Sequence, residues 1–192
     1  EDLPANVGIL DIEQGGKTEI SEDYWLTDVT LSYSSWCYTN GQTYKDAAMV
    51  IRNMIDVWSK KGIVLLNISP KADGTIPEEQ RNVLATLGQW IDKHKEAVYE
   101  TRAHSVFGYG DAAFEKGNFG GQSATMKYSE KDIRFTVSKD GQNLYVYFLG
   151  MPAAESDIQI QNTGGGTIRR VSVIGSGKEL KWVAGNNEVT VS

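Results

Sequence analysis

The sequence is poor in cysteine and proline and contains no long hydrophobic run. Its 192 residues include one cysteine and four prolines. Cys37 cannot form an internal disulfide, and no other Cys or His stands near it at metal-ligand spacing. No stretch approaches the ~20 apolar residues that a bilayer-spanning helix needs. These absences exclude an internal disulfide, a cysteine-based metal site and a membrane-spanning helix.

Positive charge is also scarce. The formal net charge is −6, and the acidic excess lies in residues 1–100, where 9 basic residues face 16 acidic ones. No basic stripe is present that could neutralise phosphates, so the charge pattern argues against nucleic-acid binding and favours a neutral partner such as a sugar. With 40% hydrophobic and 23% charged residues, the composition is that of an ordinary globular protein.

The first half of the chain has an α/β pattern. Short strands are predicted over residues 7–12 and 25–31. From Tyr44 onward, apolar residues three and four apart predict a helix that closes at residues 60–62. The apolar run at residues 63–68 predicts a buried strand, and Pro77 opens a second helix that ends near Lys95. Two successive strand-plus-helix units indicate a parallel sheet.

In the second half of the chain, apolar and polar residues alternate with a period of two. Turn signals such as Asp140-Gly141 separate the predicted strands, and this spacing is typical of an antiparallel β-sandwich. We therefore expect an α/β part over residues 1–102 and an all-β part over residues 103–192, with residues 103–121 as the passage between them. The seven predicted strands are residues 123–128, 132–137, 143–149, 158–161, 168–174, 180–183 and 188–191.

Several separate motifs resemble one family of enzymes. They are the aromatic loop Trp36-Cys37-Tyr38 and residues 65–77, 87–90 and 96–102. In order and spacing they resemble the C-terminal part of the α-L-fucosidases of glycoside hydrolase family 29. Residues 132–136 and 144–147 resemble the first strands of the β-sandwich that ends those enzymes. Since the chain also begins at Glu1 rather than Met, we expect it to be a portion of a longer protein.

The resemblance implies a fold and an activity. The fold would be the terminal βα units of a (β/α)₈-like barrel, incomplete here, followed by a β-sandwich. The parent enzyme would be a retaining hydrolase of terminal α-L-fucosyl linkages in glycans, with an aspartate nucleophile and a carboxylic acid about 5–5.5 Å apart. No residue of this chain matches that nucleophile, so we expect the chain alone to be inactive. No cofactor is implied, and a periplasmic or extracellular location is favoured over a lysosomal one.

Glu13 is the predicted general acid/base. It ends an apolar strand at a glycine-rich bend, where barrel enzymes place catalytic side chains, and it resembles the acid/base of some family members. The alternative is a solvated loop carboxylate, and Glu19 and Glu22 are the next candidates for the acid. Some members carry a glutamate after the tryptophan that matches Trp25, but Leu26 stands there in this chain.

Two tryptophans are predicted to bind substrate. Trp36 is expected to form an apolar wall of the sugar pocket, because aromatic faces pack well on the C–H face of a pyranose, and its alternative is a loop aromatic that closes the core. Trp25 matches a family tryptophan near the same pocket. Asn67, at the end of the predicted buried strand, is expected to satisfy loop backbone groups rather than contact substrate.

Functions and partners of other kinds remain open from the sequence. The β-rich half could be a non-catalytic carbohydrate-binding or structural β-sandwich module. An incomplete barrel would expose apolar surface, and we expect that surface to pair with the missing N-terminal barrel portion or with a second copy. The expected ligand is a fucosylated oligosaccharide or glycoconjugate.

Overall fold

The computed structural model describes residues 7–112, 126–153 and 156–192, and the chain divides into two compact units. Unit 1 consists of the described parts of residues 1–89 and 112–127, and unit 2 of those of residues 90–111 and 128–192. The boundary expected between residues 102 and 103 falls inside a strand of unit 2, so the last residues of the expected α/β part belong to the β-rich unit.

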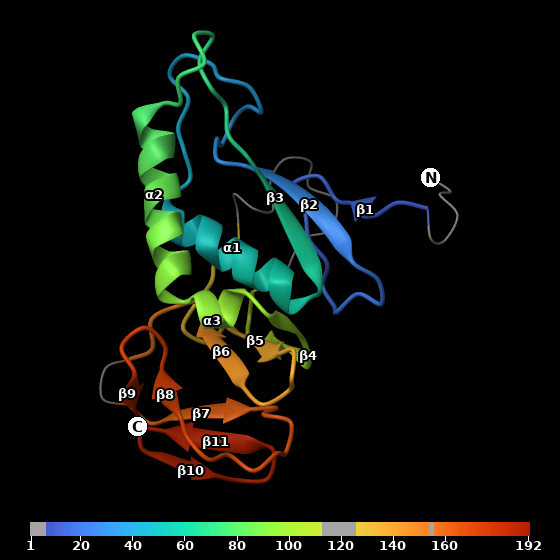
Figure 1. Ribbon diagram of the computed structural model, residues 1–192, viewed down its shortest axis with the longest axis vertical. Helices are drawn as coiled ribbons and strands as arrows, with labels where there is room; N and C mark the ends of the chain where they lie inside the picture. Colours follow the sequence, from blue (N-terminus) through green and yellow to red (C-terminus); the bar gives the residue numbers. More distant parts are fainter. Residues whose placement is uncertain (1–6, 113–125, 154–155) are drawn as a thin grey trace. The chain divides into compact units, whose positions relative to one another are not determined.

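Unit 1 is built on an open parallel sheet with the order β1-β2-β3 (Figure 1). The strands are β1 (Leu10–Asp11), β2 (Trp25–Thr30) and β3 (Gly62–Asn67), and both pairings are parallel. These strands fall within the three segments that the apolar pattern predicts, apart from Gly62, which β3 adds at its start. The described strands of unit 1 do not close into a barrel.

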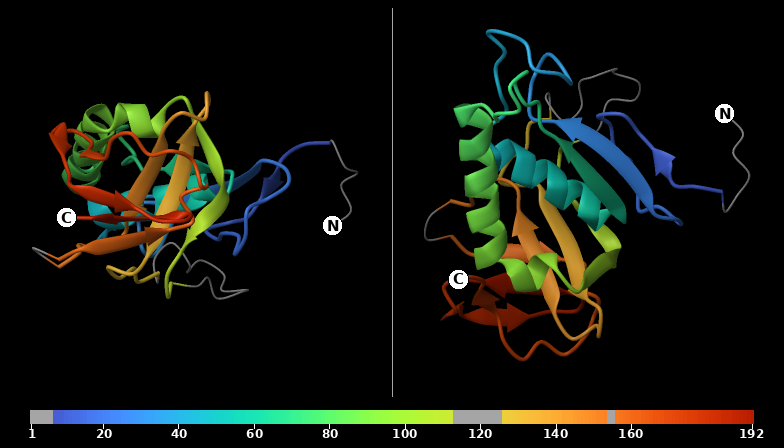
Figure 2. Two further views of the ribbon diagram at one scale, coloured as in Figure 1. Left: turned by 90° about the horizontal axis from the view of Figure 1, so that it is seen from below. Right: turned by 45° about the horizontal axis from the view of Figure 1, so that its top comes forward.

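Helix α1 (Ala47–Ser59) connects β2 to β3 and packs against the sheet (Figure 2). Its start is capped by Asp46, whose Oδ1 accepts a hydrogen bond of 2.7 Å from the Met49 N–H. Its end carries a buried ion pair of 2.7 Å between Lys60 Nζ and Asp56 Oδ2. The next helix, α2 (Glu78–Lys93), begins after Pro77 as predicted and extends across the boundary between the units.

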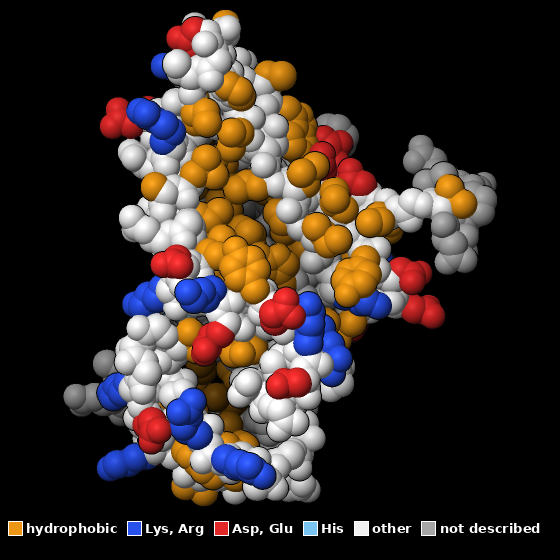
Figure 3. Space-filling view, in the orientation of Figure 1, with side chains coloured by type: hydrophobic (Ala, Val, Ile, Leu, Met, Phe, Trp, Pro, Cys, Tyr) orange, Lys and Arg blue, Asp and Glu red, His pale blue; other side chains and the backbone are white. Residues whose placement is uncertain are grey.

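The two faces of the sheet differ in burial. Trp25 and Val29 point to the face that α1 covers, where they are 1% and 2% exposed. Strand alternation places Ile63 and Leu65 of β3 on the opposite face, where they are 41% and 58% exposed. Figure 3 shows hydrophobic side chains gathered over this part of unit 1. A sheet with one covered and one exposed apolar face is unusual for parallel strands, which are ordinarily buried on both faces.

Unit 2 contains a short helix and two three-stranded antiparallel sheets. Helix α3 (Lys95–Val98) precedes the first sheet, which has the order β4-β5-β6, and the second sheet has the order β10-β11-β7. A two-stranded ribbon of β8 and β9 completes the described strands of this unit. The bounds are β4 (Thr101–Tyr109), β5 (Ile133–Ser138), β6 (Leu144–Phe148), β7 (Ile158–Gln161), β8 (Ser172–Val173), β9 (Lys178–Glu179), β10 (Trp182–Ala184) and β11 (Glu188–Val191).

One hydrophobic core joins the two sheets of unit 2. Phe135 of β5 is fully buried and belongs to the same cluster as Ile160 of β7 and Val189 of β11. The structure differs from the predicted strands in several places: β9 was not predicted, and the strand expected at residues 180–183 begins only at Trp182. Residues 103–109, expected as part of the passage, form β4 together with residues 101–102. Residues 168–174 form strand only at Ser172–Val173. Residues 126–128 are not strand, while residues 123–125 lie outside the described residues.

Candidate functional site

Residues 12–14, which follow β1, stay hydrogen-bonded to β2, so Glu13 lies beside that strand. The Ile12 N–H donates to Leu26 O and the Gln14 N–H to Asp28 O, both at 2.9 Å. Gln14 then adopts a φ of 46° and the chain turns away into Gly15 and Gly16. Glu13 and Gln14 are the central residues of this turn, which a 3.2 Å hydrogen bond from the Gly15 N–H to Ile12 O closes, so Glu13 lies at the glycine-rich bend from which its role was predicted.

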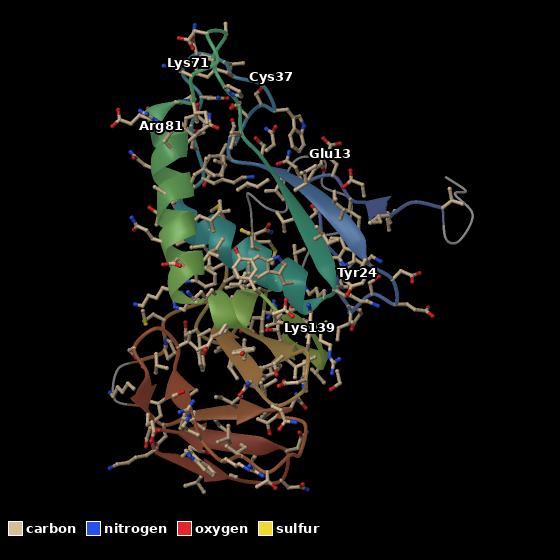
Figure 4. The ribbon with its side chains drawn as sticks, in the orientation of Figure 1. Glu13, Tyr24, Cys37, Lys71, Arg81 and Lys139 are labelled. Carbon is tan, nitrogen blue, oxygen red and sulfur yellow. The ribbon has the colours of Figure 1, made fainter. Side chains whose placement is uncertain are left out.

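Trp36 lies next to Glu13. The Trp36 indole Nε1–H donates a hydrogen bond of 3.1 Å to Glu13 Oε1, although the two residues are 23 positions apart. Figure 4 shows Glu13 and Cys37, the neighbour of Trp36, toward one end of the sheet and Tyr24 toward the other. The structure thus brings together two of the three residues selected from the sequence, at the end of the sheet where β2 and β3 finish.

Asn67 holds the backbone of the loop that carries Trp36. Its side-chain Nδ2 donates to Trp36 O at 2.9 Å and to Thr30 Oγ1 at 3.2 Å. The prediction that Asn67 satisfies loop backbone is confirmed. The loop is also closed at its base, since Ser32 and Tyr44 form an isolated antiparallel bridge.

Two further carboxylates lie on the same face of the sheet as Glu13. Asp11 precedes it by two residues, and Asp28 occupies the corresponding face of β2. Burial raises the pKa of the Asp11 carboxyl, and the negative charge of Asp28 raises it further, against backbone N–H donors of Asp28 and Ile12 that lower it. Asp28 Oδ1 is buried and accepts no hydrogen bond from the described residues. Sequence reasoning missed Asp28, because its place beside Asp11 and Glu13 follows from the pairing of β1 with β2.

Trp25 does not lie at this site. Its side chain is 1% exposed, its Nε1–H donates to Lys60 O at 3.0 Å, and it occupies the first position of β2, at the opposite end from Asn67. Its ring lies against Gly62 and is closed off from solvent, so it is not open to a ligand. This placement corrects the substrate-binding role: Trp25 is a core residue that packs between the sheet and α1.

The alternative acid Glu22 is also placed elsewhere. The Lys61 Nζ donates to Glu22 O, and the Ser21 N–H donates to Lys60 O at 3.3 Å, so this stretch lies beside the end of α1. Glu19 is exposed, and no hydrogen bond or ion pair involves its side chain within the described ranges. Of the three glutamates considered, Glu13 is the one in contact with Trp36.

Within the described residues the structure contains neither a metal-binding cluster nor a membrane-spanning helix. Over residues 7–112, 126–153 and 156–192, no three His, Cys, Asp or Glu side chains are placed to hold a metal ion. The helices in these same ranges are too short or too polar to cross a membrane.

Comparison with known proteins identifies related enzymes. A model of the α-L-fucosidase family matches residues 6–96. The plasma α-L-fucosidase of Rattus norvegicus is 24% identical over 163 residues, which are 83% of this chain and 32% of the relative. The human tissue α-L-fucosidase is 24% identical over 184 residues, which are 91% of this chain and 34% of the relative. The chain thus spans about a third of the length of these curated relatives.

Solved structures show the same fold. The α-fucosidase of Thermotoga maritima in complex with fucose superposes with a TM-score of 0.70 and 25% identity, covering 92% of this chain and 37% of that chain. The α-L-fucosidase isoenzyme 1 of Paenibacillus thiaminolyticus superposes with a TM-score of 0.72 over 95% of this chain and 40% of its own, and its 22% identity supports the fold alone.

These matches define the class of protein to which the chain is related, the glycoside hydrolases. Within that class the chain is a relative of the α-L-fucosidases, and the resemblance that its motifs indicate is confirmed.

Proposed function

We propose that this chain supplies the general acid/base and one wall of the sugar pocket to a retaining α-L-fucosidase that hydrolyses terminal α-L-fucosyl linkages in glycans. The observation that carries the proposal is the 3.1 Å hydrogen bond from Trp36 Nε1 to Glu13 Oε1, at the end of a sheet from a fucosidase-like segment. The aspartate nucleophile would come from outside residues 1–192, and the chain alone would be inactive.

The chemistry assigns a role to each oxygen of Glu13. The indole N–H engages Oε1 and fixes the plane of the carboxyl group. Oε2 then transfers a proton to the departing glycosidic oxygen and later receives one from water, as the second carboxyl group of a retaining glycosidase does. The face of the Trp36 ring packs on the C–H groups of the fucose.

The exposed face of the sheet supports a partner for unit 1. Ile63 and Leu65 share this face with Asp11 and Asp28, so covering it would also enclose the acidic groups. We propose that the N-terminal barrel portion of the parent enzyme covers it, with a second copy as the alternative. If a second copy covers this face, sedimentation should show dimers at micromolar concentration. The Leu65→Lys variant should then be a monomer, because the charge disrupts the apolar contact.

The two sheets of unit 2, with their common core, support a β-sandwich as the C-terminal part of the same enzyme. In this arrangement β4 and the strands that follow it belong to the sandwich. The terminal βα units of the proposed barrel are then β2-α1 and β3-α2.

An assay on an aryl α-L-fucoside tests the proposal. The chain alone is expected to give no turnover, and clear turnover would contradict an outside nucleophile. In the longer parent enzyme, Glu13→Ala should slow hydrolysis by about 10²–10⁴-fold, and azide or a good leaving group should restore part of the rate. Glu19→Ala is the matched control. Full activity of the Glu13→Ala enzyme would remove Glu13 from the mechanism.

A depression on unit 2 supports a second function, non-catalytic glycan binding. Its volume is about 290 Å³, and its lining offers hydroxyl, amide and backbone groups from Ser105, Val106, Asn162, Gly164, Gly165 and Asn187. Calorimetry of the whole chain with fucosylated oligosaccharides separates the two functions. Binding that Asn162→Ala abolishes and Trp36→Ala preserves favours the depression, and the reverse result favours the site at Glu13.

A further inference from the structure

A set of buried polar side chains links the start of α2 to the loop that carries Trp36. Gln80, in the first turn of α2, is fully buried. Its Oε1 accepts from the Ser69 N–H at 2.9 Å, and its Nε2 donates to Ser69 O and Ser69 Oγ, each at 3.0 Å. Gln80 therefore satisfies both backbone groups of Ser69, two residues beyond the end of β3.

Gln42 extends this connection from Ser69 to the loop. Its Nε2 donates to Ser69 Oγ at 3.2 Å, and its Oε1 accepts from Ser32 Oγ at 3.0 Å. Ser32 Oγ in turn accepts from the backbone N–H groups of Ser34 at 3.1 Å and Ser35 at 3.3 Å. The backbone just before Trp36 is thus held by side chains that reach back to α2.

A second set of hydrogen bonds holds the backbone at Trp36 itself. Thr30 Oγ1 donates to Ser35 O at 3.3 Å and accepts from Asn67 Nδ2 at 3.2 Å, and the same Nδ2 donates to Trp36 O at 2.9 Å. The carbonyls of Ser35 and Trp36 are therefore both fixed from the ends of β2 and β3. Such support from rigid elements sets the position of a side chain that contacts a reactive group.

We infer that Asn67 and Gln80 are positioning residues for the Glu13 carboxyl group: they fix the loop backbone so that the Trp36 indole N–H meets Glu13 Oε1. Asn67 acts on the Trp36 carbonyl directly, and Gln80 acts through Ser69 and Gln42. This inference rests on the proposed role of Glu13, but the geometry that it concerns is present in the chain by itself.

The test measures the indole ¹⁵N–¹H signals of the whole chain by NMR. The sequence has five tryptophans, and Trp36→Phe identifies the Trp36 signal. Glu13→Ala is expected to shift that signal, because it removes the acceptor. In the Asn67→Leu and Gln80→Leu backgrounds, the shift that Glu13→Ala causes should fall to roughly half or less, since residues in one hydrogen-bond network are coupled.

Matched controls separate positioning from unfolding. The Trp25 indole, which donates to Lys60 O at 3.0 Å, reports whether the core of unit 1 is intact. Asn82→Leu replaces an exposed amide of α2 and should leave the Trp36 response unchanged. If Asn67→Leu also displaces the Trp25 signal, the same test is made with Asn67→Asp. This variant keeps the size of the side chain and removes its hydrogen-bond donor.

An undiminished Trp36 response in both backgrounds, with an intact Trp25 signal, would overturn the inference. This outcome differs from a failure of the proposed function. If Glu13→Ala leaves the parent enzyme fully active while the NMR coupling persists, the network positions Glu13 but Glu13 is not the acid. In an active parent, Asn67→Leu should lower kcat by a larger factor than it raises KM, because substrate contacts remain while the carboxyl is misplaced.

Discussion

The ring of Trp25 lies directly against Gly62, its partner on the neighbouring strand. A Cβ atom built at Gly62 would fall 2.6 Å from two atoms of the Trp25 ring and 2.5 Å from Val57 Cγ1. The space that a side chain would take at the start of β3 is occupied by the indole, whose Nε1–H reaches Lys60 O at the end of α1. The turn from α1 into β3 therefore depends on a residue without a side chain.

Replacing Gly62 is the first prediction. Gly62→Ala should lower the free energy of unfolding by about 1–3 kcal/mol, because the added methyl group overpacks a closed core. Gly88→Ala is the matched control, since nothing lies within 4 Å of a Cβ at Gly88 and alanine favours the helix by about 0.5–1 kcal/mol. Urea unfolding followed by tryptophan fluorescence measures both. Equal midpoints for the two variants would contradict the packing.

Gly108 gives the corresponding prediction for unit 2. Its φ is 146°, and a Cβ there would fall 2.0 Å from Ile133 O, where the pairing of β4 with β5 shifts register. Gly108→Ala should reduce stability by about 3 kcal/mol or more, since neither backbone can move without breaking the pairing. Gly166→Ala, in open space, should change it by less than about 0.5 kcal/mol. Thermal unfolding measures the stability of both variants, and equal values would contradict the close approach at Gly108.

Gln80 is predicted to stabilise unit 1 through its hydrogen bonds. Gln80→Ala would leave the buried N–H and carbonyl of Ser69 without their partner, at a cost of about 1–3 kcal/mol. Gln89→Ala removes an exposed glutamine from the same helix and should be nearly neutral. Denaturant titrations of the pair give the comparison, and similar losses in both would contradict the role of the Ser69 hydrogen bonds, because alanine favours a helix more than glutamine does.

Lys45 makes stability depend on pH in a specific direction. It is 1% exposed, its Nζ donates to Thr30 O at 2.8 Å, and burial lowers its pKa to about 8. In the unfolded chain the pKa is about 10.4, so between these values the unfolded state binds the extra proton and stability rises with pH. Between pH 7.5 and 10 this gain should approach about 2–3 kcal/mol.

The Lys45 effect is measured as a difference. Unfolding free energies of the wild type and Lys45→Met are compared across the pH range, because other groups also titrate there. Burial raises the pKa of Tyr147 to about 12, which lowers stability above pH 10 in both proteins and cancels in the subtraction. Parallel curves for the two proteins would show that Lys45 is not a source of the pH dependence.

Sequence patterns predicted the elements whose periodicity is regular. Helices α1 and α2 follow apolar residues three and four apart, and β3 follows an apolar run that ends in turn residues. Strand β4 was missed because its pairing is interrupted between Ala103 and Gly108, so its sequence alternates over only a few residues at a time. The core of unit 2, which draws on both sheets, is a tertiary property that no local pattern contains.

The sequence predicted the local features of the candidate site but not the contacts between distant residues. The position of Glu13 before a glycine bend is a local feature, whereas its contact with Trp36 depends on how a loop 23 residues away returns to β2. Trp25 shows the limit of such reasoning, because residue type and neighbours fit a pocket wall while strand direction puts it at the wrong end of the sheet. Asp28 needed the pairing of β1 with β2 to be recognised.

Cys37 is a natural site for attaching a thiol-reactive label to the loop that carries Trp36. It is exposed, it follows Trp36 directly, and the sequence contains no other cysteine. A fluorophore or spin label attached to the native thiol would therefore report on this loop alone, without any thiol having to be removed first. Occupancy of the sugar site and motion of the loop could then be followed in the unmutated chain.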